Sequence, residues 1–538
     1  MAGEAPSSAE AERKKITGRA GIVAAGTLFS RLLGLVRDQV LAAVFSRAAT
    51  DAFFVAFTIP NVLRQLLAEG AVQNAVLPVL AKTREQEGDE AARRLFRALR
   101  GLSLLTLTVV TVAGIALAPQ LVDLFAGGFR AHEGQYERTV TLTRWVFPYI
   151  FFMGTAALGV AALNVHQRFV ATSFAPALLN VAFVVCALAL PDLVDARGHD
   201  RTLALAAGVL IGGLLQVVAQ WPSLKAIGYL VAPSFDLALR GVRETLRRMG
   251  PVLIGLGVYY VDVVLARRFL SELGVGAQSY FGWALRLCDF PQGIFVMALQ
   301  SATLPSLALL VARGDHAEVK KTFVYGMRLS LFVALAASVL FVALAEPVVA
   351  LIFQRGHFDA ESTRETAKAL AAQGLGIWMV AGVRQLVAVY YALGDTRTPV
   401  IVAAVDLAVF VTLALSLRGP LGHVGVSLAV TGASGAQMIM LWIGLRFRLG
   451  DTGLFEIARS ALKTLLAAAA AAAAGMGAAW ALAAPPGAGA SRVVLPGLAA
   501  VSAYGVVFLI AAWVVRSEEL RGLVEAVARR RSSGASAS

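Results

Sequence analysis

The sequence contains little charge, little cysteine and little histidine. Only 15% of its 538 residues are charged, whereas soluble domains usually carry about 25%. The two cysteines, Cys186 and Cys288, lie in separate apolar runs and indicate packing residues rather than a disulfide or metal cluster. The six histidines have no metal-ligand spacing, and the chain contains neither a Walker loop nor a G-x-S-x-G elbow. These absences argue against an enzyme, and we expect no resident cofactor.

What the sequence does contain is apolar stretches of membrane length. It is 58% hydrophobic, with a mean hydropathy of +0.71. Stretches of about 20 apolar residues are long enough to cross a bilayer, so we predict an all-α, polytopic membrane protein. The second and eighth stretches are the least hydrophobic, which predicts helices that are broken or face a cavity. The fourteen predicted spans are residues 20–43, 52–80, 101–121, 142–165, 171–190, 203–221, 249–266, 280–311, 329–345, 370–393, 399–417, 421–445, 464–483 and 494–515.

The distribution of basic residues predicts the orientation. With the N-terminus inside, the cytoplasmic segments hold 30 of the 48 Lys and Arg residues, the external loops hold 12, and six lie within spans. This bias favours an even number of spans with both termini in the cytoplasm. It also explains the net charge of +14 without a nucleic-acid partner. Because the first span contains Arg31, Arg37 and Asp38, we interpret it as a retained helix and not as a signal peptide.

An internal repeat predicts the domain organisation. Residues 71–78 read AVQNAVLP and residues 298–305 read ALQSATLP, an offset of 227 residues. This offset aligns spans 1–6 with spans 7–12, and an even number of spans per unit predicts parallel repeats. The predicted parts are a cytoplasmic segment (1–19), two six-helix lobes (20–230 and 231–448), an appended helix pair (449–516) and a cytoplasmic tail (517–538).

The cations within the spans are the strongest functional signal. The six are Arg31, Arg37, Arg64, Arg144, Arg286 and Arg384. An arginine at the centre of a membrane helix costs at least about 2.5–3.5 kcal/mol, so it should face a partner or an aqueous cavity. Arg144 lies near a span end, where it can extend to the interface, and Arg384 stays unassigned. Because arginine binds phosphate in a bidentate manner, the other four predict a cavity for a large anion.

Charge pairing is the competing explanation, with Asp38, Glu69 and Asp289 as partners. Three acids do not neutralise four arginines, so we favour the anion cavity. Two further acids, Asp262 and Asp406, have no cation nearby in the sequence. They predict either a sodium or proton site that couples transport to an ion, or hydrogen-bonded contacts between helices.

Several longer motifs lie in and beside the predicted spans. They are FSRLLGLVRD (29–38), TDAFFVAF (50–57), IPN (59–61) with Arg64, AEGA (68–71), Gly250-Pro251, Arg286 with Asp289-Phe290-Pro291 and Gly293, and GDTRTP (394–399). These motifs resemble those of one family, the MurJ (MviN) lipid II flippases. The resemblance extends from about residue 20 through the transmembrane region.

This resemblance implies the multidrug/oligosaccharidyl-lipid/polysaccharide exporter fold, with fourteen helices in two lobes and a central cationic cavity. It implies that the final helix pair helps to form a groove for the lipid tail. The implied substrate is the undecaprenyl-diphosphate-linked peptidoglycan precursor, moved across the bacterial inner membrane by alternating access, with membrane lipids as the other partners. We expect a monomer driven by Na⁺ or the membrane potential. The implied substrate residues are Arg31, Arg37, Arg64 and Arg286, with Ser30, Asp38, Asp51, Glu69, Ser279 and Asp289 at the cavity or its gates.

Other functions remain open at this point. A flippase for another diphosphate-linked glycan would need the same arginines. An exporter of cationic drugs would share the fold, although an arginine-rich cavity disfavours cationic cargo. A non-transporting scaffold would not require a coherent set of cavity charges.

Overall fold

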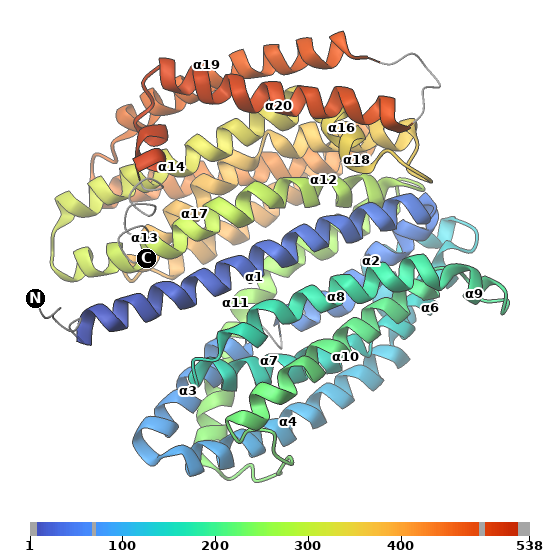
Figure 1. The fold of residues 1–538 in the computed structure, drawn as a ribbon, viewed down its shortest axis with the longest axis vertical. Coiled ribbons are helices and arrows are strands. Elements are labelled where there is room, and N and C mark those ends of the chain that lie inside the picture. The colour runs from blue at the N-terminus through green and yellow to red at the C-terminus, as the bar shows by residue number, and fades with distance from the viewer. Residues whose placement is uncertain (1–7, 67–70, 484–489, 526–538) are drawn as a thin grey trace, which may run out of the picture. The chain divides into compact units, whose positions relative to one another are not determined.

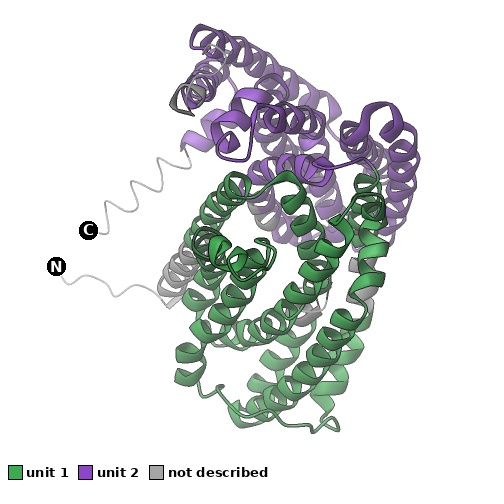
Figure 2. Ribbon diagram, turned by 90° about the vertical axis from the view of Figure 1, so that its right-hand side faces the viewer, with its two compact units in different colours: residues 1–272 green, residues 273–538 purple. Residues whose placement is uncertain are grey.

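A computed structural model describes residues 8–66, 71–483 and 490–525, and in these ranges the chain forms helices and turns without strands (Figure 1). The chain divides into two compact units, residues 1–272 (unit 1) and 273–538 (unit 2) (Figure 2). Unit 1 contains α1 (Ser8–Val44), α2 (Arg47–Arg64), α3 (Ala71–Glu87), α4 (Asp89–Ala116), α5 (Ala118–Ala126), η2 (Gly127–Ala131), α6 (Gln135–Val146), α7 (Tyr149–Val165), α8 (Phe169–Ala189), α9 (Pro191–Asp195), α10 (Leu203–Ala226) and α11 (Arg240–Ser271). Unit 2 contains α12 (Ala277–Pro291), η3 (Gln292–Val296), α13 (Met297–Ala312), α14 (His316–Ala343), α15 (Ala345–Phe353), α16 (Ala360–Gly374), α17 (Ile377–Ala392), α18 (Arg397–Leu449), α19 (Leu454–Ala481) and α20 (Ala490–Val514).

Within the described residues, every predicted span coincides with helical structure, which confirms the all-α membrane fold. In the described part of the chain, nine helices are long and apolar enough to cross a membrane. One of them, α18, covers two predicted spans. It is interrupted at Gly422, where φ is 56°, near the junction of these two spans. The predicted spans outside this apolar set are the first, second, seventh and eighth. These four contain Arg31, Arg64, Asp262 and Arg286, respectively.

The second and eighth spans are both broken, as their composition predicted. A π-helical turn follows α2 at residues 65–66, and another, η3, follows α12 from Gln292 to Val296. Residues 65 and 292 are 227 positions apart, which is the offset of the sequence repeat. Because π-helical turns break the regular hydrogen-bond ladder and are frequent at functional sites, their recurrence marks equivalent positions in the two repeats.

The internal packing of unit 1 recurs in unit 2. Helix α4 begins at Asp89 and α14 at His316, while α5 begins at Ala118 and α15 at Ala345, in both cases 227 residues later. In unit 1, α2 packs against α6, and α3 packs against α4 and α7. In unit 2, α12 packs against α16, and α13 packs against α14 and α17 in the same order. The repeat therefore extends from five identical positions in an eight-residue stretch to a shared helix arrangement.

Small residues allow the helices of unit 1 to approach closely. Gly208 and Gly212 on α10 are four residues apart and face the backbone of α8, where added Cβ atoms would lie 2.9 and 2.7 Å from the Cα atoms of Phe183 and Leu179. Gly26 on α1 faces Ser173 of α8 in the same way. Such small-residue contacts are the usual means of helix association in a bilayer, where apolar burial offers little driving force.

The appended pair, α19 and α20, also packs through small residues. Within the alanine tract, Ala467, Ala468, Ala471 and Ala472 are buried, and a Cβ at Gly475 would lie 3.0 Å from the carbonyl oxygen of Ala500 on α20. The tract is therefore a packing surface. After α20, residues 518–525 form a short helix, in which Glu519 is buried.

Candidate functional site

Arg37 lies in a polar cluster between α1 and α8. Its Nε and Nη2 donate to Oδ1 of Asp38 at 2.9 and 2.7 Å, and its Nη1 donates to Oδ1 of Asn180 at 3.2 Å. Asn180 in turn donates from Nδ2 to the backbone carbonyl of Ser30 at 3.0 Å. The side chains of Arg37 and Asp38 are only 14% and 7% exposed. Charge pairing, the competing explanation, therefore describes this arginine in the structure.

An aromatic row connects Arg37 to α2 and α7. The guanidinium lies 5.7 Å from the ring centre of Phe183, which contacts Phe53 at 5.4 Å. Phe53 stacks on Phe57 at 5.5 Å, one helical turn later, and Phe57 contacts Tyr149 at 5.6 Å. A cation over an aromatic face is stabilised by the ring quadrupole. The row explains why phenylalanines recur at a spacing of four in the second span.

Arg31 differs from Arg37. It is partly exposed on α1, and it forms no hydrogen bond or ion pair within the described ranges of the chain. The neighbouring Ser30 is also partly exposed and contributes its carbonyl to Asn180. Of the two arginines in the first predicted span, Arg31 is thus the one whose guanidinium can bind an external anion without breaking a described contact.

The residues of the second span lie at different depths of unit 1. Asp51 is completely buried near the start of α2. Arg64 is partly exposed at the end of α2, directly before the π-helical turn, and donates from Nε to Oδ1 of Asn61 at 3.0 Å. Glu69, the predicted acidic neighbour, lies outside the described residues.

A buried cation, Arg267 on α11, packs against Phe54 of α2. Its guanidinium is 5.5 Å from the ring centre of Phe54, and the residue is only 8% exposed. Asp51 and Phe54 are three residues apart, so they share one side of α2. Opposite charges are therefore buried on that side, which reduces the cost of burying either one.

In unit 2, the predicted residues lie on α12. Arg286 and Asp289 are both exposed and are three residues apart, so they share one side of the helix. Ser279 is buried in the first turn of the same helix. Directly after these residues, Pro291 and the π-helical η3 interrupt the span. Each unit thus carries an arginine within a turn or two of its π-helical segment, Arg64 in unit 1 and Arg286 in unit 2.

The predicted ion site remains a prediction. Asp262 lies on α11 of unit 1, and its Oδ1 is buried with no hydrogen-bond partner among the described residues. Asp406 lies on α18 of unit 2 and is partly buried. No group of three or more His, Cys, Asp or Glu side chains in the described ranges is placed to hold a metal ion.

The remaining two cations in spans have distinct surroundings. Arg144 is exposed on α6. Arg384 is partly buried on α17, where its Nε has no hydrogen-bond partner in the described residues and its carbonyl accepts from Gln300 at 3.2 Å.

Two of the residues that build these clusters were missed from the sequence. Asn180 is an isolated amide in the apolar fifth span, and that isolation was the available signal. Arg267 was counted as a loop residue because hydropathy ended the seventh span at residue 266, whereas α11 continues to Ser271. Because predicted helix ends are uncertain by a few residues, Arg267 was not recognised as a buried cation of this helix.

The fold defines the class of the protein. The chain superposes on a MATE multidrug resistance transporter of the MOP superfamily in its inward-facing conformation, with a TM-score of 0.65 and 16% identity over 78% of this chain and 94% of that one. It superposes better on a structure described as lipid II flippase MurJ, inward closed conformation, with a TM-score of 0.73 and 20% identity over 91% of this chain and 98% of that one. The chain therefore has the fold that these two structures share.

The sequence comparisons identify the family within this class. The family model for lipid II flippase MurJ matches residues 41–485. The lipid II flippase MurJ of Burkholderia cenocepacia is 34% identical over 428 residues, which are 78% of this chain and 82% of that protein. The probable lipid II flippase MurJ of Bdellovibrio bacteriovorus is 34% identical over 461 residues, which are 85% and 87% of the two chains. The chain belongs to the MurJ family of transporters, which makes it a multi-pass protein of the bacterial inner membrane.

Proposed function

We propose that this protein is a lipid II flippase, which moves the undecaprenyl-diphosphate-linked peptidoglycan precursor from the cytoplasmic to the periplasmic leaflet for cell-wall synthesis. The observation that carries the proposal is the family match over residues 41–485. The placement of charge supports it, because Arg31, Arg64 and Arg286 lie within predicted spans, where an arginine is costly unless it meets a partner or an aqueous cavity. The protein acts by transport alone, as a monomer with both termini in the cytoplasm, and catalyses no covalent step.

The arginines have different roles in this proposal. Arg31 and Arg64 in unit 1 and Arg286 in unit 2 contact the diphosphate during the transport cycle, since all three are at least partly exposed. Arg37 is paired with Asp38 and donates to Asn180, so it positions α1 against α8. Ser30, Asp51, Ser279 and Asp289 act at the cavity or its gates, as does Glu69.

Transport requires that the substrate bind two states of the protein with different affinity. We propose alternating access, in which the diphosphate headgroup crosses the protein while the lipid tail stays in the bilayer beside α19 and α20. The membrane potential can assist the return of an empty, positively charged protein, because each charge that crosses 100 mV gains about 2.3 kcal/mol.

Sodium is the alternative coupling agent, with Asp262 and Asp406 as candidate ligands. Transport by Asp262→Asn and Asp406→Asn should then lose any dependence on sodium that the parent protein shows. If both variants keep the parent's sodium dependence, these residues are not the ligands.

The arginine assignment is tested by measuring lipid II at the outer face of cells depleted of their own flippase. We expect Arg31→Ala, Arg64→Ala and Arg286→Ala each to lower translocation by about tenfold or more, because a charge-assisted hydrogen bond contributes about 1.5–3 kcal/mol. Arg144→Ala is the matched control, since Arg144 is also an arginine in a predicted span but lies near its end. Full translocation by all three test variants would contradict the assignment.

Two related functions differ from lipid II transport in the molecule that is moved across the membrane. The structural match to a MATE transporter supports a drug exporter of the same fold, but guanidinium groups repel cationic drugs. A flippase for another diphosphate-linked glycan would recognise the same phosphates. Restoration of growth in cells that lack a lipid II flippase, without efflux of a cationic dye, distinguishes lipid II transport from both.

A further inference from the structure

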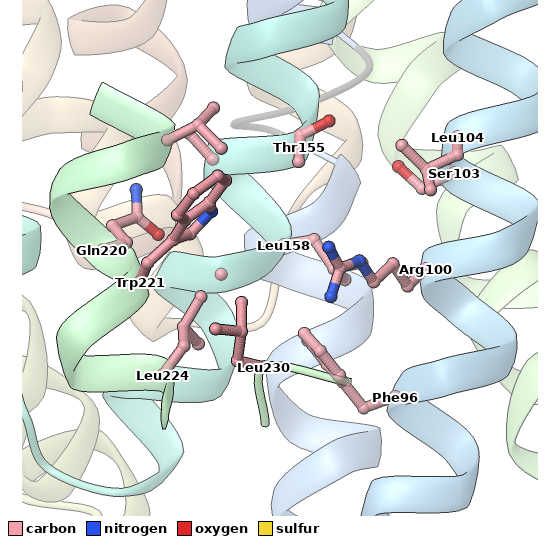
Figure 3. Close-up of a pocket in the computed structure, with 13 residues that line it drawn as sticks. Phe96, Arg100, Ser103, Leu104, Thr155, Leu158, Gln220, Trp221, Leu224 and Leu230 are labelled. Atoms are coloured by element: carbon pink, nitrogen blue, oxygen red, sulfur yellow. The ribbon is translucent and has the colours of Figure 1, made fainter. Parts of the chain in front are cut away.

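Unit 1 contains a small pocket that the transport cycle described above does not use. It lies between α4, α7 and α10, beside the segment that leads from α10 to α11 (Figure 3). Its polar lining consists of Arg100, Ser103, Thr155 and Gln220, and Trp221 borders it. In Figure 3, Arg100 points into the pocket from α4, while Gln220 and Trp221 come from α10 on the other side.

The pocket lies at a boundary between membrane and water. Arg100 directly precedes the third predicted span, which begins at residue 101, and Trp221 is the last residue of the sixth. Trp221 is 45% exposed, and tryptophan side chains concentrate at the level of lipid headgroups. By the distribution of basic residues, this boundary is the cytoplasmic one.

The polar groups of the pocket are fixed and not fully used. Arg100 donates from Nη1 to the carbonyl of Val231, which holds the guanidinium in place and leaves its other N–H groups available among the described residues. Gln220 is only 2% exposed, and its Oε1 is buried with no hydrogen-bond partner in the described part of the chain. An acceptor buried in this way costs about 1–3 kcal/mol unless a donor reaches it.

We propose that this pocket binds the headgroup of an anionic glycerophospholipid, phosphatidylglycerol. The lipid phosphate binds Arg100, and a hydroxyl of the glycerol headgroup donates to Oε1 of Gln220. The cavity volume of about 30 Å³ holds one or two water-sized groups, so only the terminal hydroxyl of the glycerol headgroup enters it. The phosphate binds the partly exposed Arg100 at the mouth, and the acyl chains stay outside. Those chains lie along the exposed apolar side chains of α4 and α10, such as Leu105 and Leu214.

A bound headgroup would connect α4 and α10 with the segment that carries Val231. That segment precedes α11, so the lipid would stabilise the connection between α10 and α11. The site is separate from the arginines proposed to contact the transported diphosphate, so it can fail while the transport function stands.

The test is native mass spectrometry of the full-length protein in detergent, titrated with phosphatidylglycerol, phosphatidic acid or phosphatidylcholine. We expect phosphatidylglycerol to bind the parent most tightly. Arg100→Gln should weaken that binding by about tenfold, as expected for loss of a charge-assisted hydrogen bond. Gln220→Leu should reduce phosphatidylglycerol to the affinity of phosphatidic acid, which has the phosphate but no glycerol headgroup.

Two further variants make the test decisive. Arg94→Gln is the matched control, because Arg94 lies on the same helix, is exposed and pairs only with Glu90 at 3.7 Å within the described residues. Ser103→Leu fills the pocket without touching the Arg100–Val231 bond. It should also abolish the preference for phosphatidylglycerol over the other two lipids.

Three results would overturn the proposal. Arg94→Gln could weaken phosphatidylglycerol binding as much as Arg100→Gln, Ser103→Leu could leave that binding unchanged, or lipid II could displace phosphatidylglycerol one for one. Should Arg100→Gln lower the melting temperature in the absence of lipid, Ser103→Leu decides the outcome.

Discussion

Arg37 donates two hydrogen bonds to a single oxygen atom, Oδ1 of its neighbour Asp38, at 2.9 and 2.7 Å. Its third nitrogen donates to Asn180 on α8 at 3.2 Å. All three nitrogen atoms of the guanidinium are therefore engaged by the protein, in a cluster that is almost closed to solvent. This arrangement separates Arg37 from Arg31, which lies six residues earlier on the same helix and is partly exposed.

We expect Arg37 and Asp38 to be strongly coupled in their contributions to stability. Asp38→Asn and Arg37→Gln should each lower the melting temperature of the purified protein, because each leaves a charged or polar partner buried. The double variant should be less destabilised than the sum of the single variants, by about 1–3 kcal/mol, as expected for residues in direct contact. Thermal unfolding in detergent measures all three.

A hydroxyl on the same helix is the control for this cycle. Thr27 is exposed and bonds only to the carbonyl of Val23 in its own helix at 2.8 Å. Thr27→Val combined with Arg37→Gln should be additive. Additivity between Arg37→Gln and Asp38→Asn would instead show that the pair does not act as a unit.

Two adjacent glutamates after α20 should differ in their effect on stability. Glu518 accepts from Nη2 of Arg328 at 2.7 Å and Glu519 accepts from Nε of the same arginine at 2.8 Å. The Glu519 side chain is 5% exposed, whereas that of Glu518 is 71% exposed. Glu519 also accepts from Ser460 and Ser517, both at 2.7 Å. Glu519→Gln should therefore cost about 3 kcal/mol, as for other buried pairs that lose one partner.

The neighbouring substitution, Glu518→Gln, should change stability little, since exposed ion pairs contribute little. Protease cleavage after Arg521 reports detachment of the short helix, and its rate should rise only in the Glu519 variant. Equal rates in the two variants would contradict a specific role for the buried carboxylate.

The same carboxylate predicts a dependence on pH. Burial alone would raise the pKa of Glu519, but hydrogen bonds from Ser460, Ser517 and Arg328 outweigh it and lower the pKa below its usual value of 4.5. A carboxyl whose pKa is lower when folded stabilises the folded state fully above its unfolded pKa and loses that contribution as the pH falls through the folded value. Cleavage at Arg521 should therefore accelerate below about pH 4.5 in the parent. The cleavage rate of Glu519→Gln should not change as the pH falls. If cleavage of this variant also accelerates at low pH, a group other than Glu519 causes the pH dependence.

The interruption in α18 depends on a close approach of the backbone. A Cβ at Gly425 would collide with the carbonyl oxygen of Leu417, whereas a Cβ at Gly419 would meet nothing within 4 Å. Gly425→Ala should thus be destabilising by about 1–3 kcal/mol, as for other overpacked sites. Gly419→Ala is the matched control and should be neutral in the same thermal assay. A neutral Gly425→Ala would show that this turn adjusts without strain.

The sequence predicted the spans well because membrane length and apolar composition are local properties. All fourteen predicted spans coincide with helices, and the two least apolar ones proved to be broken at equivalent positions. Contacts between residues far apart in the sequence could not be predicted in this way. That Arg37 reaches Asn180, 143 residues away, depends on α1 packing against α8, which no local pattern specifies. Likewise, Glu519 lies in a polar segment, and only the docking of that segment against α14 and α19 makes it buried.

The proposed function is tested most directly by lipid II translocation in cells depleted of their own flippase. The protein is expressed from a plasmid, and lipid II at the outer face is quantified by cleavage with an external enzyme that cannot enter the cytoplasm. The account predicts that the parent restores external lipid II and growth, and that Arg286→Ala, present in the membrane at the same level, does not. A parent protein that reaches the membrane but leaves lipid II in the inner leaflet would contradict it.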